Sequence, residues 1–304
     1  MDLRGAAVAV TGATGFLGRY LVDVLLARGA RVIGVVRNPG RVPGLAARGV
    51  ELRQADLGER DGLARGFAGA QAVVSNAALF SLRNRSWEDH HRANIRGTEN
   101  VFGALADAGV RRVVHVSSVA VYRAHRPRIT EDAPQLAAGT RRTFTNAYSV
   151  SKAVSEQRAW RLAEQYRLEL TAVRPCAIYG AFDPNFTAVF RRLAGLPVTV
   201  MPALMHLPLV YAGDVAEAIA RALERPVSIG HAYNVTGDDA TVWEFARAWR
   251  VAGGRGALVQ LPLPVPWRRG YDITRAREDL GWRNRPFVEA LRETFALERR
   301  AESA

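Results

Sequence analysis

Short apolar runs alternate, over the first 178 residues, with longer segments whose apolar residues recur every three or four positions. The short runs predict buried strands, and the longer segments predict helices with one buried face. The expected strands are Ala6–Val10, Arg31–Val36, Ala72–Ser75, Val113–Ser117 and Leu170–Arg174. The expected helices are Leu17–Arg28, Gly62–Phe67, Asn94–Ala108 and Ala147–Tyr166. Alternation of this kind predicts a parallel sheet with helices on both faces.

The pattern loosens after residue 178, where residues 179–208 are irregular and contain several prolines. Val210–Leu223 predicts a further helix, entered through Asp214, and Ala232–Val235 predicts a further strand. Residues 241–304 predict short helices around a proline-rich stretch. We therefore expect an α/β protein with a Rossmann-type, doubly wound parallel sheet in residues 1–178, to which residues 209–237 add a helix and a strand. Most of residues 179–304 would form a smaller substrate-binding region.

Composition narrows the class of protein. Hydrophobic residues make up 48% of the 304 positions and charged residues 23%, which is ordinary for a globular protein. We expect neither a signal peptide nor a membrane helix, because the chain has no secretory n-region and no apolar stretch of about 18 residues. The single cysteine, Cys176, excludes an intramolecular disulfide, fits a cytoplasmic location and is expected to be a small buried hydrophobe.

The formal net charge of +13 is compatible with nucleic-acid binding. The arginines, however, are scattered over expected helices and loops, and no nucleic-acid motif accompanies them. We therefore expect no nucleic-acid partner. The histidines show no ligand spacing, so we expect no metal site.

A glycine-rich turn follows the first expected strand and precedes the first expected helix. Glycines permit a tight turn and let the backbone approach a pyrophosphate, which then meets the amide donors of the helix N-terminus. The segment therefore predicts a dinucleotide site, with contacts from Gly12, Thr14, Gly15, Phe16, Leu17 and Gly18.

The end of the second strand indicates which dinucleotide is bound. An acidic residue there would hydrogen-bond the ribose 2′-hydroxyl of NAD, but this strand ends at Arg37, with Arg41 nearby and no acid. Arg37 can pair with a 2′-phosphate, so we expect NADP(H) over NAD(H); the alternative is that Arg37 is an ordinary surface arginine. Asp56 and Leu57, after a further expected strand that follows Arg41, are expected at the adenine.

The chain contains one lysine, Lys152, which lies four positions after Tyr148. The other 41 of its 42 lysines and arginines are arginines. Arginine can replace lysine where only positive charge is needed, but not where a compact ammonium must lie beside a phenol. The spacing therefore indicates that Lys152 is retained for chemistry.

Together these segments resemble the extended short-chain dehydrogenase/reductase family over nearly the whole chain. The resemblance rests on the glycine-rich turn, the Tyr148/Lys152 pair and further motifs at Asp56-Leu57, Asn76-Ala77-Ala78, Asn94–Thr98, Ser117–Tyr122, Arg174–Gly180, Val210–Ala216 and Arg275–Trp282. It implies an NAD(P)-dependent enzyme. The further cofactor contacts that it implies are Asn76, Ala77, Ala78, Lys152, Pro175 and Ala177.

The resemblance also implies catalytic roles. Tyr148 would be the general acid or base, with a pKa lowered by the Lys152 ammonium and the cationic nicotinamide. Ser118 would hydrogen-bond the substrate oxygen. Asn94 would hold a water in a proton relay, or else make a helix hydrogen bond in the core. The two tyrosines that would either line the substrate pocket or pack structurally are Tyr122 and Tyr179.

Departures from the family pattern narrow the substrate class. Ser118 is not followed by the Asp-Glu pair of sugar-nucleotide dehydratases, and the stretch 205–211 is apolar where sugar-nucleotide enzymes often have an arginine. We therefore expect an apolar or natural-product-like ketone or aldehyde, as in the hydroxysteroid dehydrogenase-like and dihydroflavonol reductase-like branches.

Four further side chains could belong to the substrate pocket. Met201 and Met205 would form an adaptable pocket wall or pack in the ordinary way. Arg141 and Arg142, in the loop before Tyr148, would hold a carboxylate on the substrate.

Three functions remain open on these observations. We expect foremost an NADP-dependent oxidoreductase that interconverts a carbonyl and an alcohol by hydride transfer. The alternatives are a sugar-nucleotide epimerase that retains NAD, and a non-catalytic NADP-binding redox sensor, which the intact set of Ser118, Tyr148 and Lys152 disfavours. The helices expected at residues 94–108 and 147–166 resemble the dimer interface of the family, so we expect a homodimer.

Overall fold

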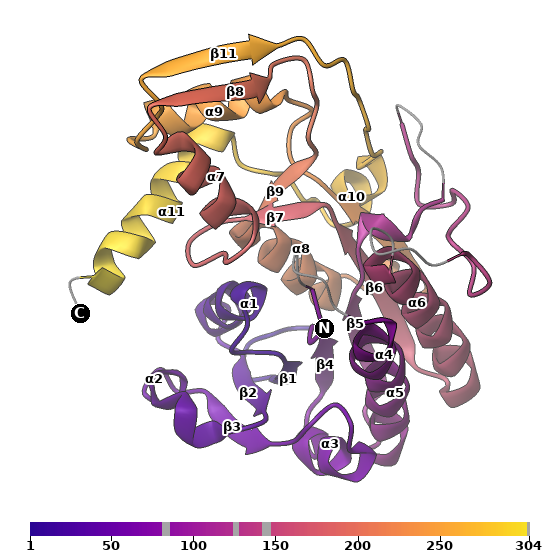
Figure 1. The fold of residues 1–304 in the computed structure, drawn as a ribbon. Helices are drawn as coiled ribbons and strands as arrows, with labels where there is room; N and C mark the ends of the chain where they lie inside the picture. Colours follow the sequence, from indigo (N-terminus) through magenta and orange to yellow (C-terminus); the bar gives the residue numbers. More distant parts are fainter. Residues whose placement is uncertain (81–85, 124–127, 142–146, 303–304) are drawn as a thin grey trace.

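Seven parallel strands form the central sheet, in the order β10-β6-β5-β4-β1-β2-β3. The computed structural model describes residues 1–80, 86–123, 128–141 and 147–302 (Figure 1). The strands are β1 (Ala7–Thr11), β2 (Arg31–Val36), β3 (Glu51–Gln54), β4 (Ala72–Ser75), β5 (Arg112–Val116), β6 (Glu169–Pro175) and β10 (Ala232–Val235). The strand order reverses between β1 and β4, and doubly wound sheets bind ligands at the carboxyl ends of the strands beside such a reversal.

Helices cover both faces of this sheet (Figure 1). On one face lie α1 (Phe16–Ala27) and α8 (Ala212–Glu224), and on the other lie α3 (Arg60–Phe67), α5 (Gly97–Asp107) and α6 (Ala147–Tyr166). Side chains of one strand alternate between the two cores: Val8 and Val10 join the first, Ala7 and Ala9 the second. Because both faces are buried, the inner strands are mostly apolar, whereas the edge strand β3 is polar and partly exposed.

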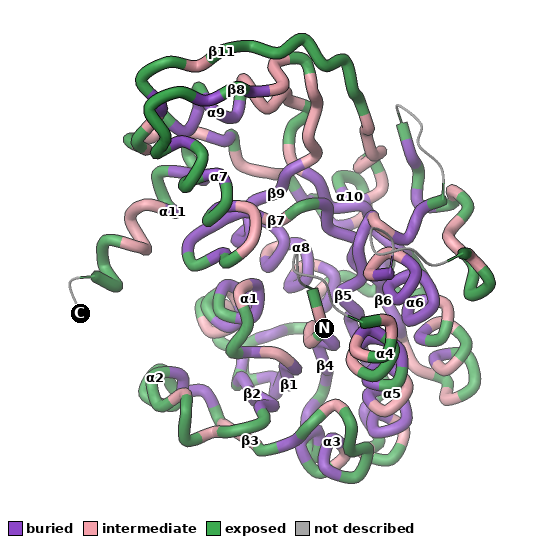
Figure 2. The backbone as a smooth tube through the Cα atoms, viewed as in Figure 1, coloured by how far each residue is buried: buried purple, intermediate pink, exposed green. Residues whose placement is uncertain are grey.

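A smaller lobe lies over the carboxyl ends of the strands (Figure 1). It contains α7 (Phe186–Ala194), β8 (Val198–Pro202), α9 (Val242–Val251), β11 (Val259–Leu263), α10 (Thr274–Asp279) and α11 (Phe287–Glu302). Two short strands, β7 (Ala177–Tyr179) and β9 (Leu209–Tyr211), pair in parallel between the lobe and the sheet. Figure 2 shows most of the sheet and α8 buried, with the edge strand β3 partly exposed, whereas β11 is exposed except at Gln260.

The predicted doubly wound α/β fold is confirmed. Two helix predictions need correction. The helix expected at Asn94–Ala108 begins only at Gly97, after a π-helical turn at His91–Arg96, and the helix expected at Val210–Leu223 begins at Ala212 because Leu209–Tyr211 pairs with β7. In the described part of the chain, no helix is both long and apolar enough to span a membrane.

Candidate active site

The glycine-rich turn lies at the strand-order reversal, where β1 ends and α1 begins. Gly12 adopts φ +70°, a left-handed conformation that favours glycine, and a Cβ there would lie 3.0 Å from the Cα of Ala77. A Cβ at Gly18 would collide with the carbonyl oxygen of Gly12. The two glycines therefore let the turn, the helix and the neighbouring loop approach one another closely.

The N-terminus of α1 is open to an anion. Gly15 is its N-cap, no side chain caps the helix, and its first turn contains no acidic residue. Thr14 and Gly15 are exposed, Phe16 is partly buried and Leu17 is buried. Uncapped amides at the positive end of the helix dipole suit a pyrophosphate, so this cradle fits the dinucleotide that the sequence predicts.

The loop after β4 is tied to this turn by Thr11, which the sequence pattern did not reveal as a site residue. The buried Thr11 hydroxyl accepts hydrogen bonds from the backbone amides of Asn76 (3.0 Å) and Ala77 (3.1 Å). The Asn76 side chain donates to the Gly12 carbonyl oxygen at 3.3 Å. The segment Asn76–Ala78 therefore begins beside the turn, and a threonine directly before the first glycine is the signal that could have found Thr11.

The residues predicted at the adenosine half lie at the same edge of the sheet. Arg37 follows the last residue of β2 and is exposed. Asp56 and Leu57 follow β3, where the Asp56 carboxylate accepts from the Gly58 amide at 2.7 Å and the Leu57 carbonyl accepts from Asn100 at 2.7 Å. Because carboxyl ends of parallel strands share one edge, Arg37 and Asp56 stand on the same side as the glycine-rich turn.

Ser118, Tyr148 and Lys152 come together next to β5. Ser118 caps the 3₁₀ turn Val119–Val121, and its side chain is hydrogen-bonded to that of Tyr148. Tyr148 stands in the first turn of α6, and Lys152 lies one turn later on the same helix face. Lys152 is 2% exposed, and its ammonium donates to the Val116 carbonyl oxygen at 2.8 Å.

Burial controls the acidity of this group. Burial raises the pKa of Tyr148 to about 12, although the hydrogen bond with Ser118 opposes the rise. Burial lowers the pKa of Lys152 to about 8, with Glu156 acting in the opposite direction. In the protein without nucleotide, Lys152 does not offset this rise, because its ammonium is bonded to the Val116 backbone and its charged neighbour is Glu156. The lowering expected with a bound cationic nicotinamide stays a prediction.

Asn94 lies in the π-helical turn that precedes α5. Its side-chain oxygen accepts from the Leu79 amide at 2.7 Å, and its amide group donates to the Leu79 carbonyl (3.1 Å) and the Ser151 hydroxyl (2.9 Å). The side chain is 2% exposed, and both of its N–H groups have protein partners. We therefore assign Asn94 the core hydrogen-bonding role, which holds the loop after β4 against α6, rather than the water relay.

Tyr122 and Tyr179 are both buried and have protein partners. The Tyr122 hydroxyl donates to the Asn234 side-chain oxygen at 2.6 Å and accepts from Arg174 at 2.8 Å. Tyr179 is 1% exposed and packs edge-on against Phe245, with ring centroids 5.3 Å apart. Of the two roles that the sequence left open for these tyrosines, these contacts agree with structural packing.

A buried ion pair lies one turn beyond Lys152, and the sequence pattern did not predict it. Arg174 donates from Nε to both carboxylate oxygens of Glu156, at 3.1 and 3.0 Å, and the two residues are 3% and 0% exposed. Burial opposes ionisation of Glu156, but the charge and hydrogen bonds of Arg174 outweigh it and lower its pKa to about 2. The spacing Tyr148, Lys152, Glu156 places all three on one face of α6.

The remaining predicted residues lie on the substrate side. The Pro175 carbonyl accepts from the Ser118 hydroxyl at 3.4 Å, and Ala177 opens β7 two residues later. Arg141 is exposed, and Arg142 lies outside the described residues. Cys176 is buried, as expected.

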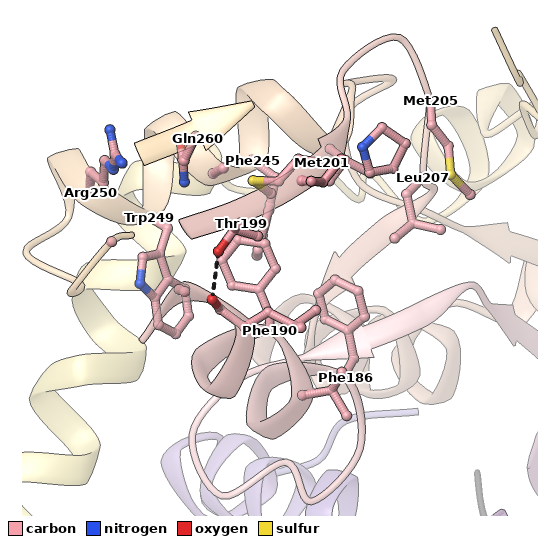
Figure 3. Close-up of a pocket in the computed structure, with 18 of the residues that line it drawn as sticks. Phe186, Phe190, Thr199, Met201, Met205, Leu207, Phe245, Trp249, Arg250 and Gln260 are labelled. Atoms are coloured by element: carbon pink, nitrogen blue, oxygen red, sulfur yellow. Dashed lines mark hydrogen bonds between the residues drawn. The ribbon is translucent and has the colours of Figure 1, made fainter. Parts of the chain in front are cut away.

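Met201 and Met205 line a cavity of about 230 Å³ in the lobe (Figure 3). Met201 is on β8 and is 7% exposed, while Met205 follows that strand and is half-buried. Of the two roles that the sequence left open for these methionines, the structure favours the pocket wall.

Comparisons with known proteins agree with this site. A family model described as NAD dependent epimerase/dehydratase family matches residues 8–236. Over 177 residues the chain is 37% identical to a 4-hydroxy-2-methyl-3-oxo-4-farnesyl-3,4-dihydroquinoline-1-oxide ketoreductase of Stigmatella aurantiaca, covering 58% of this chain and 52% of that protein. The matched part therefore spans about half the length of that relative.

Two further proteins match almost the whole chain. Over 266 residues the chain is 32% identical to a ceramide reductase of Caulobacter vibrioides (strain NA1000 / CB15N), covering 86% of this chain and 75% of that protein. The crystal structure of yeast methylglyoxal/isovaleraldehyde reductase Gre2 complexed with NADPH shares the fold with a TM-score of 0.82, at 21% identity, over 98% of this chain and 99% of that chain.

Proposed function

Because the chain belongs to the NAD dependent epimerase/dehydratase family of extended short-chain dehydrogenases/reductases, whose members are NAD(P)-dependent, we propose that it is an NADP(H)-dependent reductase of apolar ketones or aldehydes. The observation that carries this proposal is the hydrogen-bonded pair of Ser118 and Tyr148, with the chain's one lysine a helical turn away. Hydrogen-bond donors grouped in this way suit a carbonyl oxygen that gains negative charge.

The cofactor would lie along the carboxyl edge of the sheet. The turn at Gly12 and the open N-terminus of α1 would hold the pyrophosphate, and Arg37 would pair with a 2′-phosphate. When bound, the nicotinamide supplies the hydride. The protein's own task is to orient the carbonyl and to deliver a proton.

Tyr148 is suited to donating that proton. With a pKa of about 12, its phenol is fully protonated at neutral pH and can protonate a developing alkoxide, whose own proton affinity is higher still. Ser118 would hold the carbonyl oxygen beside the phenol. In this proposal the phenol donates its proton during reduction, whereas the reverse oxidation needs the phenolate.

The names of relatives support a carbonyl substrate carried on an apolar skeleton. One is a ketoreductase of a farnesylated quinoline oxide and another is a ceramide reductase. The apolar cavity in the lobe agrees with a substrate of that kind.

Tyr148→Phe tests the proposed role of the phenol. We expect the variant to lose about 10²–10⁴-fold in kcat for ketone reduction, because the positioned proton donor is removed. The affinity for NADPH, measured by calorimetry, should change little, since the phenyl ring keeps its packing against Phe80 at 4.9 Å. Turnover in Tyr148→Phe at the wild-type rate would contradict the assignment.

A further inference from the structure

The cavity in the lobe has apolar walls. Phe186 and Phe190 from α7 and Phe245 and Trp249 from α9 form one wall of stacked and edge-on rings, with Phe190 and Phe245 centroids 4.9 Å apart (Figure 3). Met201, with Met205, provides an adaptable opposite side. Side chains of this kind favour contact with alkyl groups.

Polar side chains are few at the cavity: of Thr199, Arg250 and Gln260, the first two have protein partners of their own. Thr199 donates to the Leu193 carbonyl at 2.9 Å, and Arg250 donates to the Ala257 carbonyl at 2.7 Å. A hydroxylated or charged ligand would therefore leave its water shell with little in exchange, which is costly. An apolar ligand has no such cost.

The two short strands relate the position of the cavity to that of the reaction site. Leu209 of β9 lines the cavity and is the register partner of Ala177 in β7. Paired strands lie about 4.8 Å apart, and register partners project to the same face of the sheet. Ala177 in turn is two residues from Pro175, whose carbonyl accepts from Ser118. The cavity thus begins one strand away from the residues proposed to hold the nicotinamide and the substrate oxygen.

We propose that this cavity binds an aliphatic tail of the carbonyl substrate, a straight or isoprenoid chain of about nine carbons. The proposal rests on the proposed function, because it places the reacting carbonyl at Ser118 and Tyr148. The length follows from the volume: a dry cavity of about 150 Å³ holds the six carbons of benzene, so 230 Å³ holds about nine.

A series of 2-alkanones from four to fourteen carbons tests the proposal in the wild-type enzyme with NADPH. The first carbons of the tail span the strand between the reaction site and the cavity, so the shortest ketones should differ little in kcat/KM. Each further methylene that enters the cavity should raise kcat/KM about fourfold, until the cavity is filled or the longest ketone is reached. A profile that is flat from the shortest to the longest ketone would overturn the proposal.

Ala246→Phe tests the location. Ala246 is 2% exposed and lines the cavity, so a phenyl group there occupies the space of the tail. The ratio of kcat/KM for 2-undecanone to that for 2-butanone should fall at least tenfold, with the melting curve showing that the variant is folded. An unchanged ratio in the folded variant would place the tail elsewhere.

A second variant avoids the buried position. Leu193 lines the cavity and is 46% exposed, while Leu196 is 45% exposed and does not line it. Leu193→Trp should lower the chain-length ratio, and the matched control Leu196→Trp should leave it unchanged. Equal effects of the two substitutions would contradict the assignment of the cavity.

Calorimetric binding of 2-undecanone separates this proposal from the proposed function. Wild-type protein that binds 2-undecanone, but does not reduce any ketone, would uphold the cavity and contradict the reductase, provided that Ala246→Phe weakens binding at least tenfold. Reduction of ketones with no dependence on tail length, and no loss of binding in Ala246→Phe, would uphold the reductase and overturn the tail site.

Discussion

The catalytic edge and the cavity of the lobe lie one strand apart and are built in opposite ways. At the edge, Ser118, Tyr148 and Lys152 are polar groups, each tied by a hydrogen bond to a particular partner. In the lobe, aromatic rings and methionines enclose a space with few polar neighbours, of which Thr199 and Arg250 are bonded elsewhere. In the proposed reductase, directional bonds define the reaction, whereas apolar volume selects the substrate.

This difference has a consequence for mutation. A buried charged side chain that is hydrogen-bonded cannot be replaced by one of different shape, because the replacement leaves a buried partner without its hydrogen bond, which is costly. An apolar wall tolerates exchanges that conserve volume. Conservative substitutions at the edge should therefore be severe, and conservative substitutions in the lobe should be mild.

Lys152→Arg should have the largest effect of the conservative changes. Charge is retained, but the planar guanidinium does not fit a site that is 2% exposed and bonded to the Val116 carbonyl. We expect kcat/KM to fall about 10²–10³-fold. The pH profile adds a check: wild-type reduction should decline as pH rises through about 8, where Lys152 loses its proton, while residual activity of the arginine variant should not decline there. Near-wild-type activity of Lys152→Arg would contradict the expectation that the edge tolerates conservative substitutions less well than the lobe.

Glu156→Gln should be the next largest, measured as the free energy of unfolding in urea. Removing the carboxylate leaves the Arg174 guanidinium buried without its counter-ion, which costs about 3–5 kcal/mol. Glu298→Gln is the matched control, since its ion pair with Arg191 at 2.6 Å is half-exposed and should contribute about 0–1 kcal/mol. Equal losses of unfolding free energy in the two variants would show that burial does not make the Glu156–Arg174 ion pair more important for stability than the Glu298–Arg191 pair.

Arg37→Ala sharpens the description of the edge at its adenosine end. We expect about a tenfold loss of affinity for NADPH with little change for NADH, because only NADPH carries the 2′-phosphate. Arg31→Ala, at the opposite end of the same strand, should affect neither nucleotide. An equal loss of affinity for both nucleotides would mean that Arg37 attracts them through its charge alone and does not recognise the 2′-phosphate.

Met201→Leu should have the smallest effect. The exchange conserves volume in the cavity wall, so it should cost less than about 1.5 kcal/mol of stability and change kcat/KM for a long-chain ketone by less than about threefold. A loss of tenfold or more would mean that the lobe, like the edge, depends on fixed geometry.

The same contrast explains what could be predicted from the sequence. The strands Arg31–Val36 and Ala72–Ser75 and the helix Ala147–Tyr166 have the predicted boundaries, because short apolar runs predict buried strands and the helix contains neither glycine nor proline. The short strands β7 and β9 were not predicted, since three residues contain no periodicity and only their mutual pairing creates them. Of the cavity, only the methionine wall was considered from the sequence; its aromatic wall was not predicted, because it comes from helices distant in sequence.

The site was predicted in its residues but not in its electrostatics. Spacing alone placed Tyr148 and Lys152 together, as a helix requires. The direction of the Tyr148 pKa shift could not be read from spacing, because it depends on burial and on the turn of Lys152 toward the Val116 backbone. Likewise, the core role of Asn94 became visible only once Leu79 and Ser151 were placed against it.

Identification of the nucleotide released on denaturing the purified protein tests the proposed reduction most directly. We expect protein without stoichiometric nucleotide, which then binds NADPH more tightly than NADH and exchanges it at every turnover. Stoichiometric NAD, retained through purification, would contradict this expectation and would favour an epimerase that recycles its cofactor within each turnover.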